Sequence, residues 1–157
     1  MARYAIPDEP RPGVLAHAIA DPVWPLLAQM LAGSWLALPW WLFNGAALGS
    51  SSRRVEWLWV LASVLGSAAL AWWLFVYPAN KDLSETALRF GVLSIVALKI
   101  VCAYALYTLQ HRGFEIWSYY GGVASRMPLY VLIGGFLARG FVLESLGGGA
   151  IATLVLS

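Results

Sequence analysis

Long runs of apolar residues, separated by short polar stretches, make up most of the chain after residue 21. Four such blocks cover residues 25–48, 57–77, 87–110 and 128–150. Each block is close to the length of about 20 residues that a bilayer-spanning helix needs. The pattern predicts an all-α membrane protein, with four transmembrane helices in an antiparallel bundle with short loops. Residues 1–21 are expected to form a polar, proline-punctuated tail, and residues 22–157 the transmembrane domain.

Turn-forming residues set the expected boundaries of the blocks. The polar stretch Ser50–Glu56 predicts a tight turn between the first two helices, and Ser84 is a candidate N-cap for the third. Pro39 predicts a kink or an end within the first span. Residues 111–127 are expected to form the longest connection, which contains the Gly121-Gly122 pair.

The last block, residues 128–157, is too long and too interrupted for one ordinary span. One interpretation is a span from about Pro128 to Leu146 followed by a short apolar tail. The other is a single tilted span shifted toward the C-terminus. Both place Arg139 and Glu144 within the block, where a five-residue separation sets them about 140° apart on a helix. The two side chains are therefore not expected to pair with each other on a regular helix.

Composition supports the membrane class. Of the 157 residues, 61% are hydrophobic and 11% are charged, and the mean hydropathy is +0.71. Soluble domains contain about 25% charged residues. The net charge of +2 and the lack of a basic run give no reason to expect nucleic acid as a partner. The single cysteine, Cys102, excludes a disulfide within the chain and a dithiol redox pair.

Three charged residues fall within the predicted spans, and they are the main candidates for function: Lys99, Arg139 and Glu144. Lys99 lies near the middle of the third span, where a charge costs on the order of 3 kcal/mol and needs a polar partner. One interpretation is a proton or ion pathway in which Glu144 pairs with Lys99 or Arg139. The other is structural, with the charges pairing between helices or with a partner subunit. The excess of positive charge favours a partner that supplies a carboxylate.

Two further groups of residues suggest contact surfaces. Small residues four apart predict helix-packing faces on the first two spans, and they are Gly45 with Gly49, Ala62 with Gly66, and Ser63 with Ser67. The connection after the third span is rich in aromatic side chains and predicts either an interfacial anchor or a docking loop. Its candidate docking residues are Phe114, Glu115, Trp117, Tyr119 and Tyr120.

No pattern of catalytic or metal-binding residues accompanies these features. The two histidines, His17 and His111, lie outside the predicted spans and do not form a ligand pair. The chain lacks the GxSxG, HExxH, Walker A and GxGxxG motifs. We therefore expect no enzyme activity, no metal and no cofactor. A bound lipid or pigment stays open, because a tryptophan-rich span can line such a groove without any motif.

The sequence predicts a multi-pass protein of a bacterial-type inner membrane. We expect a non-catalytic accessory or assembly subunit of a larger membrane complex, with other membrane subunits and the lipid bilayer as its partners. The alternative is a small oligomeric channel or transporter that uses the intramembrane charges. With four spans, the basic residues divide equally between the two sides, so the positive-inside rule gives no orientation. The prior for four-span proteins places both ends in the cytoplasm.

Overall fold

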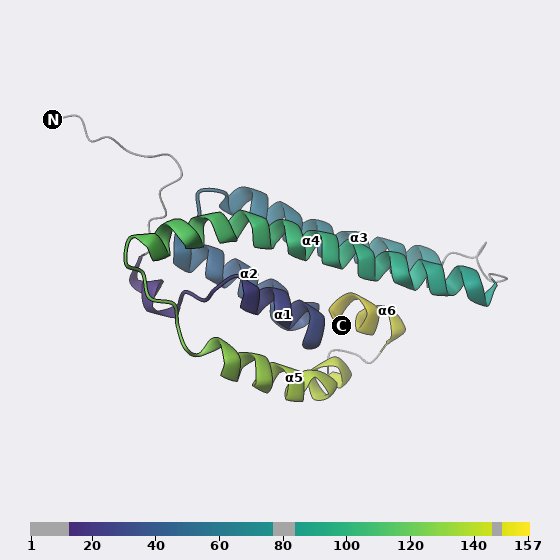
Figure 1. The fold of residues 1–157 in the computed structure, drawn as a ribbon. Helices are drawn as coiled ribbons and strands as arrows, with labels where there is room; N and C mark the ends of the chain where they lie inside the picture. Colours follow the sequence, from purple (N-terminus) through teal and green to yellow (C-terminus); the bar gives the residue numbers. More distant parts are fainter. Residues whose placement is uncertain (1–12, 77–83, 146–148) are drawn as a thin grey trace.

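The computed structural model describes residues 13–76, 84–145 and 149–157. The first twelve residues of the predicted tail, the predicted end of the second span at Tyr77 and residues 146–148 of the last block lie outside this part. Within it the chain is helical and contains no strand, which confirms the all-helical class. The elements, shown in Figure 1, are a 3-10 helix η1 (Val14–Ala18) and the α-helices α1 (Val23–Leu31), α2 (Ser34–Leu48), α3 (Arg53–Phe75), α4 (Glu85–Tyr119), α5 (Pro128–Ser145) and α6 (Ala150–Leu156).

Three of these helices, α3, α4 and α5, are long and apolar enough to cross a membrane. The first predicted span is not one helix. It consists of α1, with nine residues, and α2, with fifteen, which lie side by side in Figure 1. At about 1.5 Å per residue, both are shorter than the hydrocarbon core of about 30 Å. The prediction of a single span over residues 25–48 is therefore wrong.

The chain reverses direction at Gly33, between α1 and α2, and forms a helical hairpin. Gly33 has φ 106°, a conformation that glycine adopts readily and other residues rarely do. The hydrogen bond from Ala20 N to Asn44 Oδ1 joins the two ends of the hairpin, and the bond from Trp35 Nε1 to Ala32 O lies beside its tip. Pro39 lies inside α2, which continues past it, so of the predicted kink or end the structure excludes the end.

Helices α3 and α4 pack along each other with little space between them (Figure 1). A Cβ on Gly66 of α3 would meet Leu98 at 2.8 Å, and one on Gly91 of α4 would meet Leu74 at 2.6 Å. Residues later in α3 contact residues earlier in α4, so the two helices run in opposite directions. Of the helices in the described residues, only these two extend to the end where α3 finishes and α4 begins (Figure 1).

Helix α4 has 35 residues, which makes it about 52 Å long. The prediction that this helix ends at Gln110 and is followed by a loop is wrong, because it continues to Tyr119. A polar contact between His111 Nε2 and Glu115 Oε1, 3.2 Å apart and one helical turn from each other, supports the extra turns. The helix ends where Gly121, with φ 88°, takes a left-handed conformation.

The last block follows the first of its two interpretations, a span that begins at Pro128 and a separate apolar segment after it. Helix α5 packs against α1, and α6 lies between α5 and α3 (Figure 1). The C-terminal end of α6 reaches the tip of the α1–α2 hairpin. A Cβ on Gly33 would lie 2.7 Å from the carbonyl oxygen of Leu156. The C-terminal end of α6 therefore meets the turn that follows the C-terminal end of α1.

Candidate functional site

Lys99 has a partner within its own chain. Its side chain is only 6% exposed, and Nζ donates a 2.8 Å hydrogen bond to the carbonyl oxygen of Leu154 in the last turn of α6. The last four carbonyls of a helix have no partner inside the helix and carry its partial negative charge. The lysine thus caps a helix end, and at least one of its three donors has a partner within the chain.

Arg139 does the same at a second helix end. Its Nη1 donates a longer, 3.4 Å hydrogen bond to the carbonyl oxygen of Leu31, the last residue of α1. Because Leu31 adjoins the hairpin tip and Leu154 lies in the helix that meets this tip, the two cations gather in one region. We call Lys99, Arg139 and Gly33, with the neighbouring Gln29 and Ser34, the hairpin-tip cluster.

Gln29 and Ser34 add polar groups to this cluster. Gln29 Nε2 donates to Ser34 Oγ at 2.8 Å, and both residues are buried. The other side-chain atom, Gln29 Oε1, is buried with no hydrogen-bond partner in the part of the chain that the structure describes. Such an unpaired acceptor is uncommon in a buried position.

Glu144 does not join this cluster. It is exposed, five residues beyond Arg139 on the continuous helix α5, and about 140° around its axis. The structure therefore brings two of the three predicted intramembrane charges together and separates the carboxyl group from them.

A second polar group, which the sequence analysis did not identify, lies near the start of α3. Glu56, Gln110 and Asn44 are each no more than 1% exposed. Gln110 Nε2 donates to Glu56 Oε2 and to the carbonyl oxygen of Trp41, both at 2.8 Å, and Gln110 Oε1 accepts from Asn44 Nδ2 at 3.1 Å. Ser50 Oγ donates to the other carboxyl oxygen, Glu56 Oε1, at 2.5 Å. These bonds join α2, α3 and α4, and we call this group the buried network.

The predicted packing residues of the first span differ in role. Gly45 is buried against the network, because a Cβ at this position would overlap Glu56 Oε2 and lie 2.8 Å from Gln110 Nε2. Gly49 instead ends α2, with the left-handed φ of 66°.

The four small residues of the second span also differ in their surroundings. Ser63 and Ser67 are buried, and Ser67 Oγ donates to the carbonyl oxygen of Ser63 at 2.6 Å. Gly66 faces Leu98 of α4, whereas Ala62 is exposed.

The five predicted docking residues lie on or directly after the last turns of α4 and not on a loop. Phe114 and Trp117 turn inward, where Trp117 packs with Ile19 and Leu48 and Phe114 lies against the same group. Glu115 is exposed and pairs with His111. Tyr119 and Tyr120 are 86% and 69% exposed.

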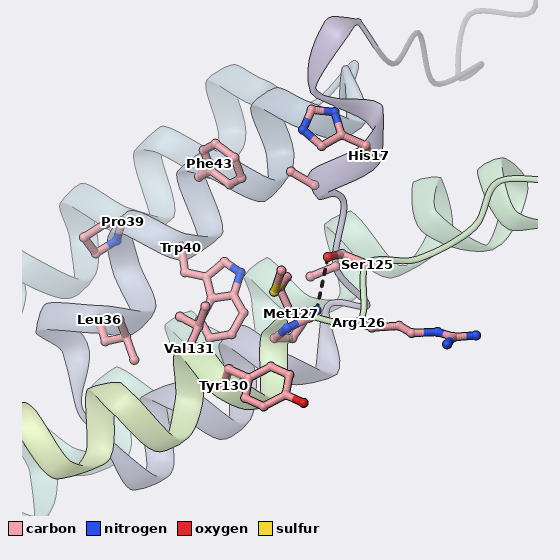
Figure 2. A pocket seen from close by; sticks show the side chains of 13 residues that line it. His17, Leu36, Pro39, Trp40, Phe43, Ser125, Arg126, Met127, Tyr130 and Val131 are labelled. Atoms are coloured by element: carbon pink, nitrogen blue, oxygen red, sulfur yellow. Dashed lines mark hydrogen bonds between the residues drawn. The ribbon is translucent and has the colours of Figure 1, made fainter.

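An open pocket of about 890 Å³ lies between α2, α5 and the segment around η1. Figure 2 shows Pro39, Trp40 and Phe43 on one side and Val131 on the other. The pocket also has polar side chains, among them Arg126, at the end where α5 begins (Figure 2). No sequence motif marks it, because it forms from segments almost 100 residues apart in the chain.

No group of three or more potential metal ligands (His, Cys, Asp or Glu) is present in residues 13–76, 84–145 and 149–157. His17 lies at the pocket, and His111 stacks on Tyr107 with the ring centroids 4.9 Å apart. Comparison with known protein families, curated proteins and solved structures finds no match to this chain. The function must therefore be inferred from the residues of the chain itself.

Proposed function

We propose that this protein is a non-catalytic accessory or assembly subunit of a larger membrane complex, and that it binds its partner through the projecting end of α4. The observation that carries the proposal is the length of this helix. At about 52 Å, α4 exceeds the full bilayer thickness of about 45 Å. A helix of this length must extend beyond the hydrocarbon core, and the polar and aromatic residues of its last turns favour that end as the part that lies outside.

The projecting end has the properties of a preformed binding surface. The inward side chains of Phe114 and Trp117 hold it against Ile19 and Leu48, so the helix end is fixed before a partner arrives. Tyr119 and Tyr120 point outward and contact each other edge to face, with ring centroids 5.6 Å apart. Tyrosine is enriched at protein interfaces, where it buries a large area at a low entropy cost.

The proposed setting is a bacterial-type inner membrane. Helices α3, α4 and α5 would cross it, while the α1–α2 hairpin and α6 would each enter without crossing. Helical spans are typical of inner membranes, whereas bacterial outer-membrane proteins are usually closed barrels. This arrangement replaces the four-span bundle expected from the sequence.

The proposal is tested by purification in a gentle detergent and mass spectrometry of the proteins that migrate with the chain. We expect a stoichiometric larger complex that is lost in the double variant Tyr119→Ala/Tyr120→Ala. The matched control is Tyr104→Ala, because Tyr104 is also exposed, at 60%, but lies within the membrane part of α4. A homogeneous assembly of this chain alone would refute the proposal, and so would a complex that survives the double substitution.

One observation favours the alternative, a small transporter. Helices that end inside the membrane, with charged groups at their ends, are typical of transporter substrate sites. The hairpin-tip cluster has this arrangement. In reconstituted vesicles, a transporter should lose flux on Lys99→Leu while remaining assembled, and Glu144→Gln should retain flux because Glu144 lies apart from the cluster. A subunit should instead lose its partner or its abundance on Lys99→Leu.

A further inference from the structure

The pocket between α2 and α5 has two walls made of apolar side chains. From α2 come Leu36, Pro39, Trp40 and Phe43, and from α5 comes Val131 (Figure 2). Its volume of about 890 Å³ lies in the range of about 300–1,000 Å³ that is usual for small-molecule sites. It is open on one side, and its α5 wall belongs to a helix that is apolar enough to cross a membrane. A molecule dissolved in the bilayer could therefore enter it sideways.

The polarity of the pocket changes along its length. Leu36 and Pro39 lie at one end, and His17, Ser125 and Arg126 lie at the other, beside the first residues of α5 (Figure 2). The depth of the pocket rests on the proposed arrangement, in which α5 enters the membrane at Pro128; the polar end would then lie at the membrane interface and the apolar end deeper in the hydrocarbon. This gradient is that of a phospholipid, whose headgroup lies at the interface and whose acyl chains point inward.

The charge at the polar end selects the headgroup. Arg126 is exposed at the rim of the pocket, and its side chain extends outward, away from the cavity, where a headgroup outside the apolar part would lie (Figure 2). The described lining contains this arginine and His17 but neither aspartate nor glutamate. The N-terminal end of α5, with its partial positive charge, opens at the same rim. Arginine binds phosphate through paired hydrogen bonds, and nothing acidic in the lining opposes it.

We propose that this pocket binds an anionic phospholipid, with acyl-chain carbons between α2 and α5 and the phosphate at Arg126. The bound lipid completes the apolar face that Trp40, Phe43 and Val131 leave open. This site is separate from the projecting end of α4, so the proposal stands or falls independently of partner binding.

The experiment uses the full chain in vesicles of equal parts phosphatidylglycerol and phosphatidylcholine, followed by extraction in mild detergent and native mass spectrometry of the retained lipid. We expect retained phosphatidylglycerol to exceed phosphatidylcholine about fivefold, since one arginine near anionic lipid contributes on the order of 1 kcal/mol. Arg126→Glu and the milder Arg126→Gln should remove this preference. Arg54→Glu is the matched control, because it makes the same charge change at an exposed arginine outside the pocket lining.

A second pair of variants tests the acyl-chain part of the pocket. Val131→Trp places a large side chain in the cavity and should remove most of the retained lipid of both kinds. Leu137→Trp puts the same side chain on the outer face of α5, where Leu137 is 76% exposed, and should leave retention unchanged. Helical circular dichroism of each variant establishes that the protein is folded.

A phosphatidylglycerol with a diazirine on an acyl chain gives a direct readout. Irradiation should attach it to peptides that contain Pro39–Phe43 or Val131. The proposal is overturned if wild-type protein retains the two lipids equally or not at all, if Arg54→Glu weakens the preference as much as Arg126→Glu, or if the label attaches elsewhere. It is also overturned if the pocket is found to hold a pigment or a helix of a partner protein.

Discussion

The substitution Gly45→Ala tests the buried network most directly, because it adds one carbon atom at its centre. Gly45 lies inside α2, against Glu56 and Gln110. The new Cβ would lie 2.8 Å from Gln110 Nε2 and nearer still to Glu56 Oε2. One of these side chains must move, and the hydrogen bond between them, 2.8 Å long, would be lost or distorted.

The expected cost follows from three contributions. Overpacking of a dense core costs about 1–3 kcal/mol. Separating two buried polar groups costs a further 1–3 kcal/mol or so, because neither can reach water. The helix preference of alanine over glycine returns up to about 1 kcal/mol. We expect a net loss of about 2–4 kcal/mol, which at about 2–4 °C per kcal/mol for a chain of this size lowers the melting temperature by roughly 5–15 °C.

The assay is thermal unfolding in detergent, followed by tryptophan fluorescence and helical circular dichroism. Gly140→Ala is the matched control: Gly140 is also inside a helix, but a Cβ there meets nothing within 4 Å. Its melting temperature should stay within a few degrees of the wild type or rise, because only the helix preference acts. If Gly45→Ala melts at the same temperature as Gly140→Ala, the close contact between α2 and the network is absent and the reasoning is refuted.

Three further predictions concern the interior. Lys99→Met should speed hydrogen–deuterium exchange in α6, because the helix end loses its cap, whereas Lys99→Arg should not. Unchanged exchange in Lys99→Met would contradict the role of the lysine as a helix cap. Gly33→Ala should lower the melting temperature by several degrees, since φ 106° is strained for alanine and its Cβ would lie 2.7 Å from the end of α6. A melting temperature equal to that of the wild type would contradict the hairpin geometry. Cys102 is 1% exposed and should react with N-ethylmaleimide only after unfolding in SDS, whereas Tyr119→Cys in a Cys102→Ser background, at a site that is 86% exposed at the end of α4, should react in the folded protein.

The sequence predicted the regular parts of the fold because these parts depend on local pattern alone. Helix α3 was expected over residues 57–77 and is found at Arg53–Phe75. The N-cap expected at Ser84 is present, with its Oγ accepting from Ala87 N at 3.3 Å. An unbroken apolar run and a capping side chain are sufficient for such predictions.

The missed features depend on contacts between distant residues. The apolar pattern of residues 25–48 is the same for one crossing helix and for a hairpin, and Gly33 was the signal that was not used. The polar residues His111 and Glu115 suggested a loop, although their i, i+4 spacing also fits a helix.

In the candidate site, too, the sequence predicted the local features and missed those that depend on distant residues. The sequence identified Lys99 as a buried charge in need of a partner, but it could not supply Leu154, since a backbone carbonyl carries no sequence signal. Glu56 was assigned to a loop, because its buried partner Gln110 comes from a helix distant in the chain.

The hairpin also changes how many times the chain passes from one side of the membrane to the other. In the proposed arrangement the three crossing helices are an odd number, so the residues before α3 and those after α5 would lie on opposite sides, whereas four spans would place both ends on one side. Among the described residues, Arg53, Arg54, Arg112 and Arg126 then gather at the end where η1 lies, and Arg89 remains at the other. In that arrangement the equal division of basic residues becomes a strong asymmetry, and the positive-inside rule would place the end that holds the α2–α5 pocket and the last turns of α4 in the cytoplasm.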